Sequence, residues 1–247
     1  MKELPEQNKI ILNSDFNKRF LELDALRGIA AIMVVLFHYT LSSNGKLLGW
    51  EFRYGVTGVD LFFMISGFVI FMTTSRIKQW PHFLVSRFAR LYPAFWCCMS
   101  LTAIVMIYIE PQLFSLSRLL ANLTMASIFF DEEYLDQSYW TLLVELMFYF
   151  WIVLLLISGN IKNIVLAGFF LTLIIIIFHT SSENYPKIYE LVTRKVELLN
   201  HFPLFFSGIL LYLIKENKNV ARYWWMFFFA LLQPVVCMVM EAGLNTM

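Results

Sequence analysis

The chain of 247 residues is too apolar for a water-soluble protein, because 59% of its residues are hydrophobic and 15% are charged, against about 45–50% and about 25% in soluble domains. Its 19 Lys and Arg residues nearly balance 18 Asp and Glu residues, so the net charge of +1 gives no reason to expect a nucleic-acid partner. The apolar residues come in runs of about twenty, the length of a helix that crosses a hydrocarbon core. The sequence therefore predicts an all-α, polytopic bundle of transmembrane helices.

The apolar runs define the predicted spans. Residues 1–22 are predicted to form a cytoplasmic lead-in without the features of a signal peptide, and residues 23–247 a single membrane domain. An eighth candidate, 114–130, is a short run that contains Arg118 and Asn122, so it could cross, lie in the interface or re-enter. The seven runs that are long and apolar enough to cross are 24–43, 56–75, 92–110, 138–157, 163–180, 199–214 and 223–241.

Basic residues in the loops predict the orientation, because loops rich in Lys and Arg stay in the cytoplasm. Segment 76–90 holds four bases and no acid, segment 215–222 holds three bases, and segment 131–136 holds four acids and no base. Both basic segments and the N-terminus can lie in the cytoplasm only if 114–130 does not cross, which is the topology that we favour. If 114–130 crosses, 215–222 lies outside.

The first predicted span carries two ionisable residues on one helical face. Arg27 and His38 lie eleven residues apart, which is three helical turns plus about 20°, and about 16 Å along the axis. Asp24 precedes Arg27 by three residues, where a local ion pair can form. The alternative is that Arg27 extends to lipid phosphates and that His38 makes an interhelical hydrogen bond.

Two carboxylates lie in other spans at a depth that we predict to match His38. Asp60 is about one turn inside the second span, and Glu145 is about a turn and a half inside the span that opens at 138. Ionisable side chains in a membrane are expensive and need a polar or functional environment. An imidazole beside carboxylates can deprotonate a hydroxyl group, because an acid stabilises the imidazolium ion. The alternative is a packing network of buried polar groups.

Two arginines before the third predicted span suggest an anion site. Arg87 and Arg90 lie three residues apart in a basic loop that we predict to face the cytoplasm, and guanidinium groups bind phosphate through two parallel hydrogen bonds. The alternative is a plain orientation signal that contacts anionic lipids. The three cysteines show no spacing typical of metal ligands, so no metal site is predicted.

Four motifs in order resemble a known family. The segments LDALRGIAAIMVVLFHY, GVDLFFMISGFVI, RFARLYP and SYWTLLVELMFY are similar to those of acyltransferase family 3, the bacterial integral-membrane O-acyltransferases. This resemblance implies transfer of an acyl group, usually acetyl from acetyl-CoA, to a hydroxyl group of a cell-envelope or exported glycan. The acceptors implied are lipopolysaccharide, peptidoglycan, exopolysaccharide or lipid-linked oligosaccharide.

The resemblance also implies residue roles and a location. The pair Arg27 and His38 would be central together with Glu145, and Arg87 and Arg90 would belong to the CoA side. We therefore predict His38, Glu145 and Asp60 as catalytic residues and Arg27, Arg87 and Arg90 as residues that bind the acyl-CoA donor. The location would be the bacterial inner (cytoplasmic) membrane, with membrane lipids as partners and the N-terminus in the cytoplasm. Family members have about ten spans of bilayer length, so the final spans are expected to be missing here.

Two other classes of function fit parts of the pattern. Ionisable residues within spans also mark the pathways of solute or glycan transporters, although the chain shows no inverted repeat. The chain could also be an inactive remnant of an acyltransferase. Flux that does not depend on CoA would indicate a transporter.

Overall fold

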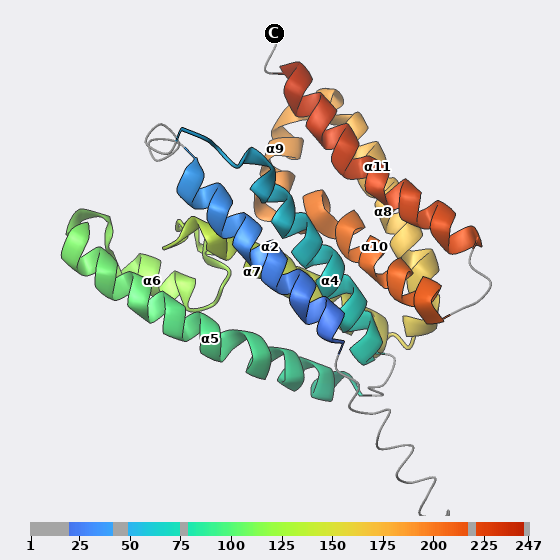
Figure 1. Cartoon of the computed structure of the whole chain (residues 1–247), viewed down its shortest axis with the longest axis horizontal. Helices are drawn as coiled ribbons and strands as arrows, with labels where there is room; N and C mark the ends of the chain where they lie inside the picture. Colours follow the sequence, from blue (N-terminus) through green and yellow to red (C-terminus); the bar gives the residue numbers. More distant parts are fainter. Residues whose placement is uncertain (1–19, 42–48, 75–78, 217–220, 245–247) are drawn as a thin grey trace, which may run out of the picture. The chain divides into compact units, whose positions relative to one another are not determined.

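The computed structural model describes residues 20–41, 49–74, 79–216 and 221–244, with side chains as far as Gln233 (Figure 1). The described residues form helices and turns without any strand, which confirms the predicted all-α fold. The helices are α2 (Leu21–Thr40), α4 (Thr57–Thr74), α5 (Trp80–Ile109), α6 (Leu116–Asn122), α7 (Trp140–Ile157), α8 (Ile164–Thr180), α9 (Pro186–Lys195), α10 (Leu198–Glu216) and α11 (Ala221–Leu244), and the turn η1 (Arg53–Val56) leads into α4.

Helices of membrane-spanning length account for most of the predicted spans. The predicted spans 24–43 and 223–241 correspond to α2 and α11, which have 20 and 24 residues. Within the described part of the chain, five helical segments are long and apolar enough to cross by length and composition: Arg53–Thr74, Trp80–Ile109, Gln137–Ile157, Ile161–Thr180 and Leu198–Glu216.

The chain divides into two compact units, residues 1–62 and 63–247, with the division inside α4. In the first unit, α2 packs closely against η1 and the first turn of α4. A Cβ atom at Gly55 would overlap the carbonyl of Met33, and one at Gly58 would lie 2.7 Å from the carbonyl oxygen of Ala30. Glycine is therefore required at both positions for the two backbones to approach.

Helix α10 is the central helix of the second unit. Every residue from Phe202 to Leu210 is buried, because α4, α7, α8 and α11 pack around it, as Figure 1 shows for α8 and α11. On the α7 side, the Phe205 ring stacks on Phe148 with ring centroids 4.2 Å apart. On the α8 side, Gly168 faces the Phe206 ring so closely that a Cβ atom would overlap it.

The second half of α4 approaches α10 at backbone distance. A Cβ atom at Gly67 would overlap the carbonyl of Phe205, and one at Gly208 would overlap the carbonyl of Met64. Two glycines on facing helices thus remove the side chains that would hold the backbones apart. The stacking of Phe63 on Phe205, with centroids 4.8 Å apart, continues the same contact.

The helix directions place the two basic segments at one end of the second unit. Helices α4, α7 and α10 run in parallel, because Phe63 and Trp140 near the start of their helices both contact His201 near the start of α10. The end of α4, which leads into 76–90, therefore lies at the same end as the end of α10, which leads into 215–222. The cytoplasmic location of both basic segments stays a prediction.

The segment 114–130 forms no helix of membrane-spanning length. Helix α6 has only seven residues, and the chain then turns back on itself. Arg118 donates hydrogen bonds to the carbonyls of Leu113, Glu133 and Tyr134. The buried Asn122 donates to the carbonyl of Glu133 and accepts from the backbone N–H of Leu135 at 3.1 Å. These polar residues, which interrupt the apolar run in the sequence, hold the turn together.

One predicted boundary was wrong. Helix α5 begins at Trp80, twelve residues before the expected start at 92, with Pro81 in its first turn and Pro93 inside it. A proline in the first turn costs no hydrogen bond. Arg87 and Arg90 are therefore part of a continuous helix of 30 residues and do not lie in a loop.

The α4–α10 contact gives the first prediction. We expect Gly208→Ala to destabilise the protein by roughly 1–3 kcal/mol or more, because the added methyl group must push two backbones apart. The thermal midpoint of the detergent-solubilised protein measures this effect. Gly28→Ala is the matched control: its Cβ atom meets nothing within 4 Å, and alanine is the better helix former. Equal midpoints for the two variants would contradict the proposed contact.

Candidate functional site

Glu145 is the carboxylate at the centre of a hydrogen-bonded group in the second unit. Its Oε1 atom accepts a hydrogen bond from the Ser66 hydroxyl at 3.4 Å, across the interface between α4 and α7. The same oxygen accepts from the hydroxyl of Tyr149, one turn further along α7. A carboxylate within an apolar bundle requires such donors, because an unpaired polar group there costs several kcal/mol.

Arg87 lies on the other side of Tyr149 and is almost fully buried, with 6% of its surface exposed. Its guanidinium carbon lies 6.0 Å from the centre of the Tyr149 ring and 5.5 Å from that of Phe83. The Nε and Nη1 atoms have no hydrogen-bond partner among the residues that the structure describes. Orphaned donors on a buried arginine are rare and point to a ligand or another missing partner.

The position of Arg87 corrects its predicted surroundings. Tyr149 is the tenth of the 18 residues of α7, so Arg87 lies beside the middle of α7 and not beyond its end. Arg90, one turn later, is exposed. The pair therefore does not present two equivalent arginines at a membrane surface.

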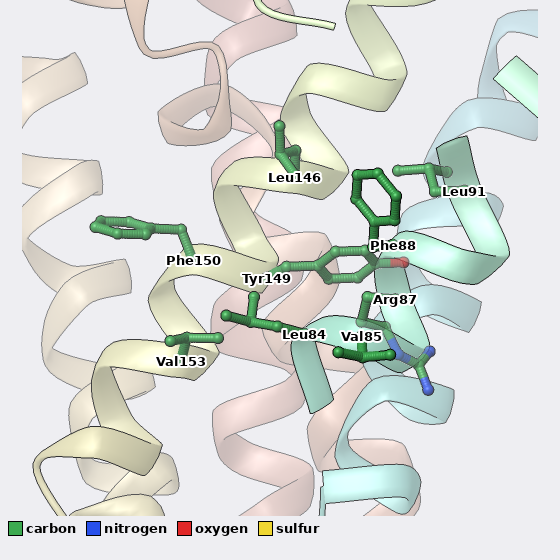
Figure 2. A pocket seen from close by; sticks show the side chains of 9 residues that line it. All are labelled: Leu84, Val85, Arg87, Phe88, Leu91, Leu146, Tyr149, Phe150 and Val153. Carbon is green, nitrogen blue, oxygen red and sulfur yellow. The ribbon is translucent and has the colours of Figure 1, made fainter. Parts of the chain in front are cut away.

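A groove of about 570 Å³ lies between α5 and α7 beside this group (Figure 2). Two of its lining residues, Arg87 and Tyr149, are polar, and the others are aliphatic or aromatic. Figure 2 shows the Tyr149 ring across the groove wall with its hydroxyl directed toward α5, and the Arg87 guanidinium at the end near Val85. The lining residues are Leu84, Val85, Arg87, Phe88, Leu91, Leu146, Tyr149, Phe150 and Val153.

The first unit holds the remaining predicted site residues. Arg27 forms an ion pair with Asp24, with 3.6 Å between Nη1 and Oδ1, as expected from their spacing. His38 is exposed near the end of α2, and its ring contacts the edge of Phe37 at a centroid distance of 5.3 Å. Asp60 is half-buried in the first turn of α4.

The expectation that His38 and Asp60 lie at one depth was wrong. Gly58 packs against Ala30 and Val34, so Asp60, two residues later, lies level with Ala30 and the turn that holds Arg27. His38 is eight residues from Ala30 along α2, or about 12 Å. Glu145 belongs to the second unit, and its meeting with His38 stays a prediction.

Several residues around Glu145 were missed from the sequence. Tyr149 lies four residues after Glu145, a spacing that could have revealed the contact. It was missed because the surrounding motif contains several other aromatic residues, from which it did not stand out. Ser66 was interpreted only as a small residue for helix packing. His201, interpreted as structural, lies between Phe63 and Trp140, with both centroid distances 5.0 Å.

Two connections meet at the end of the second unit opposite the basic segments. Lys195, at the end of α9, donates to the carbonyl of Ile128 and to Asp131, both at 2.6 Å, and this contact lowers the pKa of Asp131. Nearby, the Tyr134 hydroxyl and the Glu197 Oε2 atom are buried without a hydrogen-bond partner in the described ranges. Burial raises the pKa of both side chains, that of Glu197 to about 7.

Among the residues whose positions are described, no three His, Cys, Asp or Glu side chains are grouped so that they could hold a metal ion.

The sequence matches the model of a protein family described as "Acyltransferase domain" over residues 20–245. BcsY of Komagataeibacter xylinus, named as a membrane-bound transacylase, is 36% identical over 110 residues, 42% of this chain and 25% of that protein. The peptidoglycan O-acetyltransferase OatA of Listeria monocytogenes is 28% identical over 149 residues, 51% of this chain and 22% of that protein. An O-acetyl transferase of Shigella phage Sf6 is 27% identical over 224 residues, 81% of this chain and 64% of that protein.

The chain thus spans less than two thirds of the length of each of these relatives. No solved structure is significantly similar to it.

The raised pKa of Glu197 gives a prediction of pH-dependent stability. The folded protein holds the Glu197 proton up to about pH 7, whereas the unfolded chain releases it near the ordinary pKa of 4.5. Stability therefore falls as the pH rises from about 4.5 to about 7, and the penalty remains above that range. We expect Glu197→Gln to be more stable than the parent at pH 8 and to lose this dependence, as measured by thermal midpoints between pH 5 and 8.

The exposed Glu190 of α9 provides the matched control. Glu190→Gln should keep the pH profile of the parent protein. A parent-like profile in Glu197→Gln would show that this carboxyl group does not titrate near pH 7.

Proposed function

The chain belongs to the acyltransferase domain family, and on that premise we propose that it transfers an acyl group from acyl-CoA to a hydroxyl group of a cell-envelope or exported glycan. The observation that carries the proposal furthest is the buried Arg87, whose unpartnered Nε and Nη1 atoms lie next to the Tyr149–Glu145 hydrogen bond. The names of OatA and the phage protein, which specify O-acetyl transfer, favour acetyl as the group that is transferred. Acetyl-CoA is then the donor.

The net reaction exchanges a thioester for an ester. The acceptor oxygen forms a bond with the thioester carbonyl carbon, the carbon–sulfur bond breaks, and CoA leaves as a thiol after it takes up a proton. We assign removal of the hydroxyl proton to His38, because imidazole is the side chain that most often serves as a general base. Glu145 is assigned the negative charge that favours the protonated imidazole, whereas Asp60, which lies level with Ala30, is not part of this proposal.

The guanidinium groups are assigned to the donor. Arg87 and Arg90 bind the phosphate or carbonyl oxygens of acyl-CoA, and the two orphaned donors of Arg87 fit this role chemically. Arg27 is also assigned to binding of the acyl-CoA donor. A protein placed in the bacterial inner membrane with its N-terminus in the cytoplasm would receive acyl-CoA from inside and the glycan acceptor from outside, among membrane lipids.

We expect His38→Ala to lower acyl transfer by about 10²–10⁴-fold, because a lost general base slows the reaction by this much. Transfer from radiolabelled acetyl-CoA to envelope glycans in membrane vesicles measures it, and mass spectrometry identifies the acylated glycan. His82→Ala, which changes an exposed histidine of α5, is the control and should retain activity. Parent-like activity in a correctly inserted His38→Ala protein would exclude the base role.

Substitution of Arg87 by Lys keeps the charge but removes the planar donor group. We expect Arg87→Lys to raise the KM for acyl-CoA about ten- to a hundredfold, since a charge-assisted hydrogen bond contributes about 1.5–3 kcal/mol. Arg90→Lys should act in the same direction. Arg53→Lys, at an exposed arginine that pairs with Glu51, is the control. An unchanged KM in both Arg87→Lys and Arg90→Lys would exclude a donor site at this pair.

A further inference from the structure

Tyr149 on α7 buries a hydroxyl group within a wall of mostly apolar side chains. Only 3% of its surface is exposed, and Figure 2 shows its ring extending from α7 toward α5. A phenylalanine ring would fill the same space without the free-energy cost of removing a hydroxyl group from water. The hydroxyl group of Tyr149 therefore needs a reason beyond packing.

This hydroxyl group donates a hydrogen bond to Oε1 of Glu145. Ser66 on α4 donates to the same oxygen, but its distance of 3.4 Å exceeds the range of about 2.5–3.0 Å that is usual for hydroxyl donors. Hydrogen bonds weaken as donor and acceptor separate. Tyr149 is therefore the stronger of these two donors and the one that orients the carboxyl group.

The second oxygen of Glu145 takes part in neither of these two bonds, because both end on Oε1. Glu145 is only half-buried, whereas Tyr149 is buried. A carboxylate that is held through one oxygen can present the other oxygen to a third group in a fixed direction. In the proposed function this third group is the imidazole of His38.

Helix α5 fixes the ring of Tyr149. Phe83 meets this ring edge to face, with ring centroids 6.0 Å apart, and the guanidinium carbon of Arg87 lies 6.0 Å from its centre. Phe83 and Arg87 are both buried. These contacts restrict the ring from a second helix, so the place of the hydroxyl group does not depend on α7 alone. Tyr149 thereby connects α5 to Glu145.

We propose that Tyr149 is a positioning residue for acyl transfer: its ring is held by α5, and its hydroxyl group holds Oε1 of Glu145 so that the carboxylate is oriented toward the base. This inference rests on the proposed acyltransferase function and adds to it a residue that does not touch the substrate. Tyr149 then acts on turnover, whereas the arginines act on binding of the donor.

Dicyclohexylcarbodiimide, an apolar reagent that modifies carboxyl groups inside membranes, tests the contact without any substrate. Loss of the Tyr149 hydroxyl group frees Oε1 to attack the reagent. Tyr149→Phe should therefore increase the rate of labelling at Glu145 at least about threefold, as measured by mass spectrometry of the purified full chain. Equal labelling rates in Tyr149→Phe and the parent would overturn the proposal.

Tyr139→Phe is the matched control for this labelling. The hydroxyl group of Tyr139, just before α7, forms a hydrogen bond with Thr102 of α5 at 2.9 Å. Tyr139→Phe also removes one buried hydroxyl contact between the same two parts of the chain, and it should be labelled at Glu145 like the parent. Faster labelling in both variants would indicate general loosening of the fold and would overturn the specific contact.

Turnover shows whether the contact serves the reaction. We expect Tyr149→Phe to lower the kcat for acetyl transfer about ten- to a hundredfold, the loss expected for one hydrogen bond to a charged group, and to leave the KM for acetyl-CoA unchanged. Tyr139→Phe should keep the kcat of the parent, with both values expressed per mole of folded protein. Equal losses of kcat in the two variants would show that the Tyr149 hydroxyl group only stabilises the fold.

A double-mutant cycle identifies the group through which Tyr149 acts. When Glu145 is replaced by Gln, no charge remains to be oriented, so adding Tyr149→Phe should change kcat by less than about twofold. Losses that multiply independently would show that Tyr149 acts elsewhere and would overturn the positioning role.

The same measurements separate this inference from the proposed function. Acyl transfer that Tyr149→Phe leaves unchanged would overturn the inference and keep the acyltransferase function intact. Faster labelling of Glu145 in Tyr149→Phe, in a protein whose parent transfers no acyl group from acyl-CoA, would refute the proposed function and leave Tyr149 as a structural residue.

Discussion

The contact between the backbones of α4 and α10 fixes the arrangement of the second unit. Gly67 and Gly208 allow carbonyl groups of one helix to touch the other. Even the methyl group of alanine would not fit at either position. Ser66 precedes Gly67 and therefore faces α7, where its hydroxyl donates to Glu145. Helix α10 also packs against α7, which carries Glu145. A displacement at the α4–α10 contact would therefore shift Ser66 relative to Glu145. The hydrogen bond between Ser66 and Glu145 thus depends on the contact that Gly67 and Gly208 make.

The buried polar side chains of this bundle differ in whether their atoms have hydrogen-bond partners. Glu145 accepts two hydrogen bonds, and the Asn122 amide bonds to the backbone of Glu133 and Leu135. Arg87 is equally enclosed but leaves Nε and Nη1 without partners among the described residues. A protein stabilised only by its own contacts would gain by replacing such an arginine with an apolar residue. In the proposal above, a bound donor completes this pairing.

The sequence predicts the helical class and most spans because the thickness of the hydrocarbon core sets the length of each apolar run, and these runs can be read directly from the sequence. It also predicts that both basic segments lie at the same end. The start of α5 was missed because the charged residues between Trp80 and Arg90 were placed outside the apolar span, although their backbone continues the same helix. The depth of Asp60 relative to His38 depends on the register in which Gly58 meets Ala30, which no single-helix pattern encodes. Tyr149 was missed because its role follows from its neighbours in space, Glu145 and Arg87.

The length of α5 has a consequence for the surrounding bilayer. Its 30 residues extend about 45 Å, against a hydrocarbon core of about 30 Å. The helix therefore cannot stand along the membrane normal with both ends at the core boundaries, so it must tilt or carry one end into the headgroup region. Either response depends on the local thickness of the membrane, through hydrophobic mismatch. Helix α5 also forms one wall of the groove. A change in lipid chain length that alters the tilt of α5 would therefore alter the width of the groove.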